Sequence, residues 1–163
     1  MSFDTLQPAF QPYWPAWQRS HSLPPRSFRE GAFVFKVSLN DIWRVIAIPA
    51  RKSVGSLADA ILKSVKFDED HLWAFDLEDR LGGGINIKHP YMDRDADAYS
   101  ADDVLIGELP LAVGDCMTFT YDYGDNWQFD VELMRVDDPD RKLKAARVIE
   151  SHGKAPRQYA DWD

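Results

Sequence analysis

The sequence predicts an α+β fold in which a mixed or antiparallel β-sheet packs against one main helix. Two pairs of β-forming segments are each joined by a short turn, and a segment with helical periodicity lies between the pairs. With 163 residues, 45% hydrophobic and 13% aromatic, the chain can form one domain with a substantial core. We assign residues 1–30 to an N-terminal arm and residues 31–163 to a single domain.

The N-terminal arm does not fit a regular element. It holds five of the ten prolines, at positions 8, 12, 15, 24 and 25, and this spacing excludes a regular helix or a central strand. Between these prolines lie four aromatic residues, Phe10, Tyr13, Trp14 and Trp17. Because solvated tails are usually poor in aromatic residues, we expect the arm to dock on the domain or on a second subunit. A disordered leader is the alternative.

The domain opens with a predicted β-hairpin over residues 33–48. Its two β-rich runs, FVFKVSL and IWRVIAI, flank the turn signal Asn40-Asp41. Either Ser53 or Ser56 can cap a helix over residues 56–66. One apolar stripe of this helix recurs at helical spacing and should face the sheet, formed by Leu57, Ile61, Leu62 and Val65.

Residues 71–77, HLWAFDL, predict a central strand, because apolar residues occupy both of its faces. The opening order is therefore β-β-α-β, similar to a β-grasp.

The glycines at 82–84 cannot hold a regular element and predict a mobile loop, and the residues after them do not continue as a phosphate-binding loop. Aspartates at 93, 95 and 97 alternate as at the start of a calcium loop, but Ala98 replaces the required Gly. We therefore predict a solvated acidic loop.

A second hairpin is predicted over residues 117–133, where apolar and polar side chains alternate along both strands. Opposed residues in a ladder share a face. Phe119 should therefore oppose Phe129 and Tyr121 should oppose Trp127, which leaves residues 122–126 as the turn. Residues 145–150 predict a last strand, and the chain after it is expected to be irregular but pinned to the domain.

The turn of this second hairpin concentrates the candidate site residues. Gly124, Asp125 and Asn126 are residue types that accept positive φ, so turn formation explains most of the motif. The density of carboxylates remains to be explained, because neighbouring carboxylates repel one another unless a cation or a basic partner relieves them. The candidate residues for binding a ligand or partner are Asp122, Tyr123, Asp125, Trp127 and Asp130.

Composition argues against several function classes. A net charge of −8 and a pI near 4.9 oppose direct binding of nucleic acid. A single cysteine, Cys116, can form neither an internal disulfide nor a cysteine zinc site, and we expect it to be packed in its strand. His71 is expected to be a structural residue. No signal peptide or membrane-length apolar run is recognisable, so we expect a soluble cytoplasmic protein.

Several segments of the chain match one family pattern. These are YDYGDNW at 121–127, FKVSLNDIWRVIAIP, LADAILKSVKFDEDHLWAF and APRQY near the end. Over residues 33–159 the chain resembles the plasmid pRiA4b ORF-three-like family, also described as transposon passenger proteins of the TnpR type. The resemblance implies an α+β domain found near mobile elements, without an assigned activity. Family members usually carry His two residues after the motif Trp, where this chain has Phe129.

Two functions are compatible with these observations. The first is a non-catalytic binding or adaptor domain, whose partner is a protein or a second copy that also meets the aromatic arm. The alternative is a phosphotransfer or nuclease-type enzyme that uses Asp122, Asp125 and Asp130, with Asp76 as a further candidate. Its cofactor would be Mg²⁺ or Mn²⁺, held by Asp122 and Asp125, since hard oxygen ligands suit these ions. No other cofactor, no direct nucleic-acid contact and no membrane contact are expected.

Overall fold

The structure is a computed structural model, and it describes residues 27–79, 81–92 and 98–159. The predicted contacts of the N-terminal arm, and the aspartates at 93–97, therefore lie outside the described residues, except for the last four residues of the arm. Within the described residues the elements are β1 (Ala32–Leu39), β2 (Ile42–Pro49), α2 (Val54–Val65), β3 (Trp73–Glu78), β4 (Gly84–Lys88), β5 (Ala98–Ser100), η1 (Ile106–Glu108), β6 (Cys116–Tyr121), β7 (Trp127–Asp137) and β8 (Arg147–His152).

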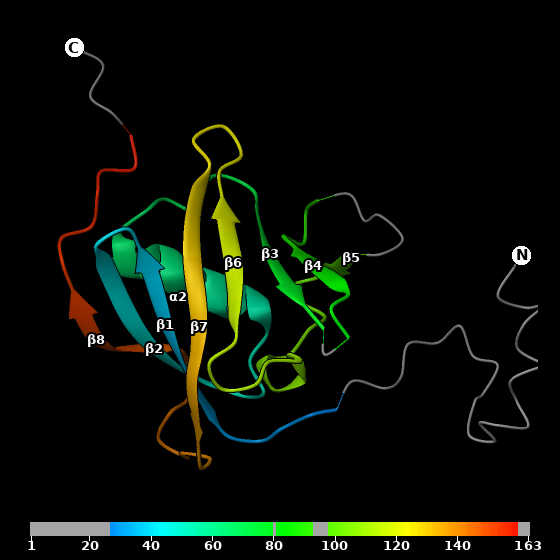
Figure 1. The fold of residues 1–163 in the computed structure, drawn as a ribbon. Helices are drawn as coiled ribbons and strands as arrows, with labels where there is room; N and C mark the ends of the chain where they lie inside the picture. Colours follow the sequence, from blue (N-terminus) through cyan, green and yellow to red (C-terminus); the bar gives the residue numbers. More distant parts are fainter. Residues whose placement is uncertain (1–26, 80, 93–97, 160–163) are drawn as a thin grey trace, which may run out of the picture.

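The strands form one sheet with the order β5-β4-β3-β6-β7-β1-β2-β8 (Figure 1). All neighbours are antiparallel except β4 and β5, which are parallel. The α+β class and the opening order β-β-α-β are confirmed. The comparison with a β-grasp is not confirmed by this strand order.

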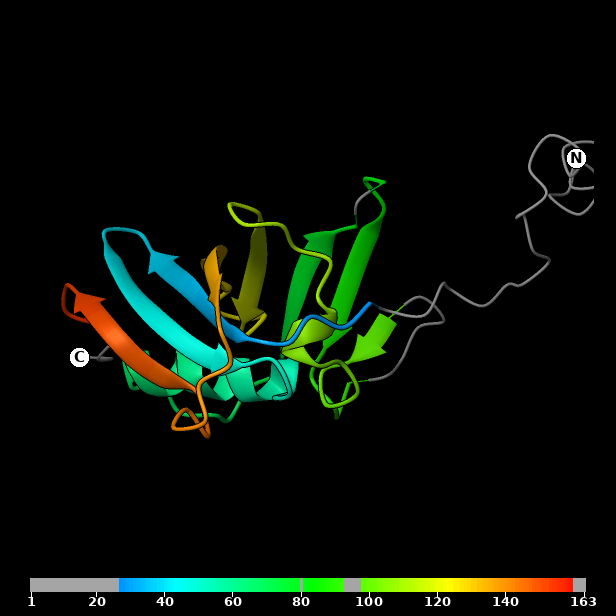
Figure 2. The same ribbon diagram turned by 90° about the horizontal axis from the view of Figure 1, so that it is seen from below.

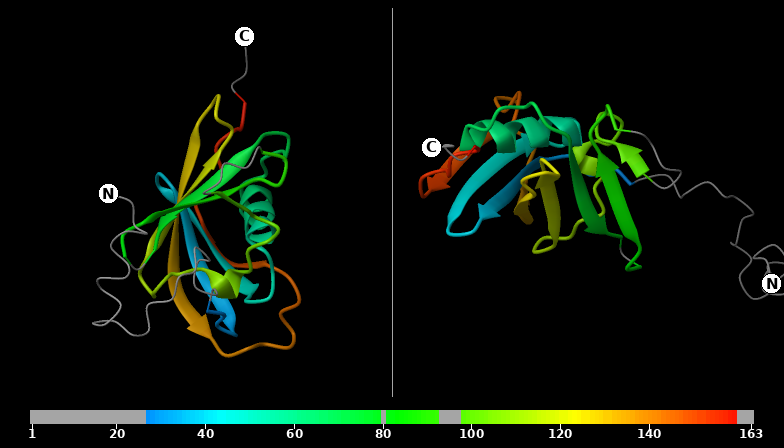
Figure 3. Two further views of the ribbon diagram at one scale, coloured as in Figure 1. Left: turned by 90° about the vertical axis from the view of Figure 1, so that its right-hand side faces the viewer. Right: turned by 90° about the horizontal axis from the view of Figure 1, so that it is seen from above.

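Helix α2 lies on one face of the sheet, and the sheet curves around it (Figures 2 and 3). The helix begins at Val54, two residues before the predicted start, because Ser53 is the cap and its side chain accepts a hydrogen bond from the backbone N–H of Ser56. It ends at Lys66, whose φ of 59° is left-handed and whose N–H bonds to the last turn. The predicted apolar stripe of the helix is fully buried or nearly so.

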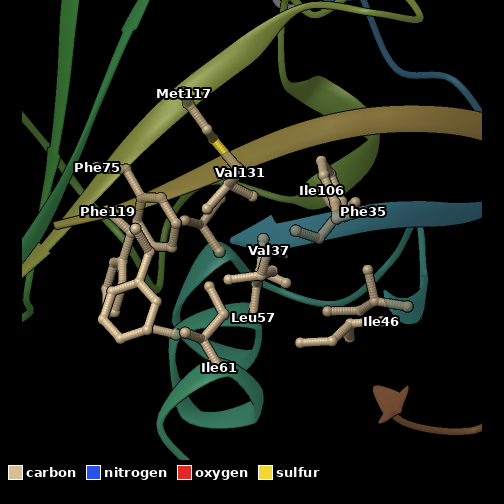
Figure 4. Packing of buried hydrophobic residues seen from close by; sticks show 14 of the residues in the cluster. Phe35, Val37, Ile46, Leu57, Ile61, Phe75, Ile106, Met117, Phe119 and Val131 are labelled. Atoms are coloured by element: carbon tan, nitrogen blue, oxygen red, sulfur yellow. The ribbon is translucent and has the colours of Figure 1, made fainter. Parts of the chain in front are cut away.

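The main core fills the space between α2 and the concave face of the sheet (Figure 4). Alternate residues of β1, β2, β3, β6 and β7 point into it, as the period of two requires. On β1 these include Phe35 and Val37, and Figure 4 shows Val37 beside Leu57 of the helix. Further along, the rings of Phe75 and Phe119 pack with their centroids 4.6 Å apart. The predicted pairs of β6 and β7, Phe119 with Phe129 and Tyr121 with Trp127, are confirmed.

Arg44 fastens β8 and the end of α2 to β2. Its side chain is buried, with 7% of the residue exposed, and its guanidinium donates to four backbone carbonyls. The acceptors are Ser64 in the last turn of α2, Trp43, and His152 and Gly153 at the end of β8, at 2.8 to 3.2 Å. A cation also complements the negative end of the helix dipole.

Some sequence expectations were incomplete. Residues 84–88 form β4, so the prediction that the glycines at 82–84 hold no regular element is wrong for Gly84, which begins the strand. The last strand lies two residues later than expected. The packing predicted for Cys116 is wrong, because this residue starts the strand on the outer face and is exposed. Partial burial and the nearby carboxylates of Glu132 and Asp130 nevertheless raise the pKa of its thiol, so the thiolate is disfavoured.

Candidate functional site

A hydrogen-bonded polar cluster lies at one end of the sheet. There the β6–β7 turn, the segment between α2 and β3, and the irregular C-terminal tail come together (Figure 3). Two of the residues that build this cluster, Asp68 and Gln158, are 90 residues apart in sequence. The side chains of the cluster are Asp70, His71, Tyr121, Asp122, Gln158 and Tyr159.

Asp122 is the structural centre of the turn. Its Oδ1 accepts hydrogen bonds from the backbone N–H groups of Gly124, at 2.9 Å, and Asp125, at 3.4 Å. Its φ is 55°, a left-handed conformation that Asp tolerates better than most residues. The second carboxylate oxygen lies 3.5 Å from Nε2 of His71, and only 8% of the residue is exposed. Asp122 therefore joins the turn to the cluster.

Tyr121 and Gln158 connect the tail to the segment after the helix. The buried hydroxyl of Tyr121 donates to the carbonyl of Asp68. The Gln158 amide donates to that same hydroxyl at 3.2 Å, and its oxygen accepts the Asp68 backbone N–H at 2.5 Å. These bonds explain why the tail is pinned, as predicted, although it has no regular structure.

The outer side of the cluster is formed by Tyr159, Asp70 and His71. The Tyr159 hydroxyl donates to Oδ2 of Asp70 at 2.6 Å and lies 3.3 Å from Nε2 of His71. The same imidazole nitrogen is 3.6 Å from Oδ1 of Asp70. One edge of the His71 ring thus faces two carboxylates and a phenol.

The titration behaviour of the cluster follows from these contacts. The hydrogen bond from Tyr159 holds the pKa of the Asp70 carboxyl below its usual value. Burial, and then the hydrogen bond to Asp70, raise the pKa of Tyr121 to about 12. The hydrogen bond to Asp70 likewise raises the pKa of Tyr159. At neutral pH both phenols are donors and Asp70 is an ionised acceptor.

The raised pKa of Tyr121 predicts a loss of stability in alkali. The neutral phenol is favoured in the folded state, so its contribution is complete below the unfolded pKa of about 10 and is lost as the pH rises toward 12. We expect the urea midpoint to fall across this window. In Tyr121→Phe the fall of the urea midpoint should be smaller. The titration of phenolate absorbance should also lack the tyrosine that ionises at the highest pH in this window. An equal fall in both proteins would contradict the assignment.

The other predicted site residues are not gathered at one point. Tyr123 and Asp125 are exposed on the turn. Trp127 faces the core, with its ring centroid 5.0 Å from that of Phe67, and its buried Nε1 has no hydrogen-bond partner among the described residues. Asp130 pairs with Thr118 in the ladder, three residues from the turn, or about 10 Å along the strand.

Asp76 is a further acidic residue of the hypothetical metal-dependent enzyme. Asp76 lies on β3, where its Oδ1 accepts a hydrogen bond from Asn86 at 2.7 Å. Within residues 27–79, 81–92 and 98–159, no group of three or more His, Cys, Asp or Glu side chains is arranged to hold a metal ion.

The exposed surface of the segments that build the cluster carries both carboxylates and apolar side chains. Leu72 is 41% exposed, Tyr159 44% and Tyr123 54%. The backbone N–H of Asp122 donates to the carbonyl of Leu72, which holds the turn beside the segment that precedes β3. We call this surface the acidic pole and define it by Asp68, Glu69, Asp70, Leu72, Tyr123, Asp125 and Tyr159.

A family profile matches the part of the chain that contains the motifs around this pole. This profile, described as plasmid pRiA4b ORF-3-like protein, matches residues 32–159. The chain belongs to the plasmid pRiA4b ORF-3-like family. Three of the segments that carry the family resemblance, around His71, around Asp122 and around Gln158, supply the polar cluster of this pRiA4b ORF-3-like domain.

A solved structure with a similar fold can be compared with this pRiA4b ORF-3-like domain. It is the crystal structure of a protein of unknown function, MM3350 from Methanosarcina mazei Go1, with 21% sequence identity and a TM-score of 0.68. The match covers 80% of this chain and 73% of that chain. A search of curated proteins found no match. No helix in the described part of the chain is long and apolar enough to cross a membrane.

Sequence reasoning missed part of the cluster of this pRiA4b ORF-3-like domain. Asp70, Gln158 and Tyr159 were not among the candidate residues, and His71 was expected to be structural only. The available signal was that His71 and the APRQY segment belong to the family pattern. Phe129, which replaces the usual histidine, is buried in the core with its ring centroid 5.8 Å from that of Phe119.

Proposed function

We propose that the domain is a non-catalytic binding module and that the acidic pole contacts a basic segment of a protein partner. One observation carries this proposal. Three segments far apart in sequence are hydrogen-bonded into one cluster, which holds exposed carboxylates beside exposed apolar and aromatic side chains. Aromatic anchors surrounded by charged groups are characteristic of protein interfaces.

The charge of the chain supports a basic partner. The net charge of −8 attracts cationic surfaces over distances comparable with the Debye length and opposes nucleic acid. Within the pole, Asp68, Asp70 and Asp125 are exposed, so their charges are available to a partner. The aromatic arm of residues 1–30 is a further proposed contact to the partner or to a second copy of the chain.

The groups that could perform acid–base chemistry are engaged with one another, which favours binding over catalysis. Tyr121 and Tyr159 have raised pKa values and retain their protons at neutral pH. The Asp122 carboxylate is occupied by turn N–H groups. The alternative, a Mg²⁺- or Mn²⁺-dependent enzyme, requires Asp130 to act with Asp122 and Asp125, and calorimetry with both ions tests its first condition.

A peptide titration tests the proposed partner chemistry. A fluorescent Lys/Arg-rich decapeptide should bind with an affinity that falls as salt is added, and a Glu-rich decapeptide should not bind. The double variant Asp68→Asn/Asp125→Asn should weaken binding by about fivefold, because two exposed charges contribute modestly. The control Glu78→Gln/Asp138→Asn makes the same change in net charge at the opposite end of the sheet.

Two results would contradict the proposal. The first is an equal loss of peptide affinity in the pole variant and its control. This result would show that binding depends on the net charge of the chain and not on the acidic pole. The second is turnover of any substrate that is abolished by His71→Gln while the fold is retained, which would identify an enzyme.

A further inference from the structure

A second candidate site is a pocket between the first half of α2 and the ends of β3 and β4. Its cavity volume is about 230 Å³. The side chains that matter for its chemistry come from four parts of the chain, and none of them belongs to the acidic pole. They are Ser56 and Asp59 from α2, Trp73 from β3, His89 and Tyr91 from the segment after β4, and Asp102 from the turn after β5.

The pocket is negatively charged. Two aspartates line it, and no Lys or Arg does. Among the described residues, neither Asp59 nor Asp102 has a hydrogen bond or an ion pair through its carboxylate. Both aspartates are exposed, so their negative charges are available to a ligand in the pocket. The pocket therefore favours a cation over an anion.

The N-terminus of α2 does not reverse this preference. A Cβ atom at Gly55 would lie 2.8 Å from Oδ1 of Asp102, so the missing side chain lets this carboxylate approach the first turn of the helix. A carboxylate at this position complements the positive end of the helix dipole. The favourable place for an anionic ligand is thus already taken by the protein itself.

Histidine supplies no compensating charge at neutral pH. Nδ1 of His89 accepts the backbone N–H of Tyr91 at 3.1 Å, which places the proton of the neutral ring on Nε2. Burial also lowers the pKa of His89. Partial burial, and then the neighbouring carboxylate of Glu69, raise the pKa of Asp59.

Aromatic rings form the remaining wall. The Trp73 and His89 rings meet edge to face with centroids 5.0 Å apart, and the Tyr91 ring is 5.2 Å from His89. Trp73 is nearly buried and forms the floor, whereas Tyr91 is exposed at the rim. Aromatic rings attract ammonium groups, and they do so most strongly where water is partly excluded.

We propose that this pocket binds the ammonium group of a primary alkylamine, with Asp59 and Asp102 as its counter-charges and the aromatic wall around its alkyl chain. The amine is either a free small molecule or the side chain of a lysine. The lining of the pocket shares no side chain with the acidic pole, although the charge of Glu69 in the pole acts on Asp59.

The expected pH dependence has a defined direction. The charged and titratable groups that act on Asp59 are Lys63 and Glu69 as well as Asp102 and His89. As the pH falls from 7 toward the raised pKa of Asp59, this carboxylate is protonated and His89 becomes positive. Both changes weaken the binding of an ammonium ion, so affinity should fall steadily with acidification.

Three probes of the same shape but different charge test the proposal by NMR titration. Butylammonium chloride should shift the amide signals of residues 53–59, 89–91 and 102 and should saturate, whereas sodium butyrate and butanol should not. Asp59→Asn and Asp102→Asn should each weaken butylammonium binding by about fivefold or more. Asp138→Asn, with the same change in net charge, should leave the affinity unchanged. Butyrate binding at least as strongly as butylammonium, or no saturable shift at these residues, would overturn the proposal.

Two further titrations distinguish a lysine side chain from a free amine, and the pocket from the acidic pole. Nα-acetyl-lysine methylamide carries the same butylammonium group on a peptide unit. Binding as tight as that of butylammonium indicates a lysine side chain, and weaker binding indicates a free amine. Asp68→Asn/Asp125→Asn should not change butylammonium affinity, so a failure at the acidic pole and a failure at this pocket can be distinguished.

Discussion

Asp122→Ala is expected to lower the free energy of unfolding by about 2 to 3 kcal/mol. The carboxylate accepts two backbone N–H groups in the turn and faces His71, and its removal leaves partly buried donors without an acceptor. Alanine also tolerates the left-handed backbone at this position less well than Asp. Urea denaturation measures the loss, and in a chain of this length it corresponds to a melting temperature lower by roughly 5 to 10 °C.

Three companion variants separate the causes. Asp122→Gly relieves the backbone strain but still lacks the acceptor, so its loss should be smaller than that of Asp122→Ala. Asp122→Asn retains an acceptor oxygen and should cost less than about 1 kcal/mol. Asp125→Asn should be nearly neutral because Asp125 is exposed at the tip of the turn. If Asp125→Asn melts several degrees below the parent, Asp125 is a structural acceptor and the interpretation of the turn is wrong.

Arg44→Met should lower the free energy of unfolding by about 3 kcal/mol. Methionine fills much of the volume of the arginine stem but cannot donate to the carbonyls of Ser64, His152 and Gly153. The loss should be concentrated at the edge of the sheet. Amide hydrogen exchange of β8 should therefore increase more than that of β6.

Arg44→Lys provides the matched control. Lysine keeps the charge near the end of α2, but its single ammonium cannot reach all four carbonyls with the planar fork of a guanidinium. We expect an intermediate loss of stability. A loss in Arg44→Lys as small as experimental error would show that charge, and not the hydrogen-bond geometry, is what β8 requires.

The fold was predictable where the signal is local. The alternation of Met117, Phe119 and Tyr121 fixed both the register and the turn of the β6–β7 hairpin, because a shift by one residue would expose every apolar side chain. The helix was located by its Ser53 cap and its apolar stripe. Strand β4 was missed because it begins at the last of three consecutive glycines and has only Ile85 and Ile87 as apolar signals.

The candidate site was less predictable because it depends on contacts between distant segments. The pairing of Asp68 with Gln158 and of Asp70 with Tyr159 has no counterpart in local periodicity. The alkylamine pocket likewise requires His89 to be placed beside the first turns of α2, which follows from the sheet order and not from any motif. Asp122 was among the predicted residues because its place in the hairpin turn is a local signal.

The strand order has a consequence for how the chain reaches its folded state. The β6–β7 hairpin joins the β3-β4-β5 part of the sheet to the β1-β2-β8 part. Strand β1 pairs with β7, so the first hairpin must wait for most of the chain before its inner edge is covered. Pairings between such distant segments slow folding, and an uncovered strand edge is prone to association with other chains. The β6–β7 hairpin, which carries the family motif, is therefore also the segment that must be synthesised before the two parts of the sheet can join.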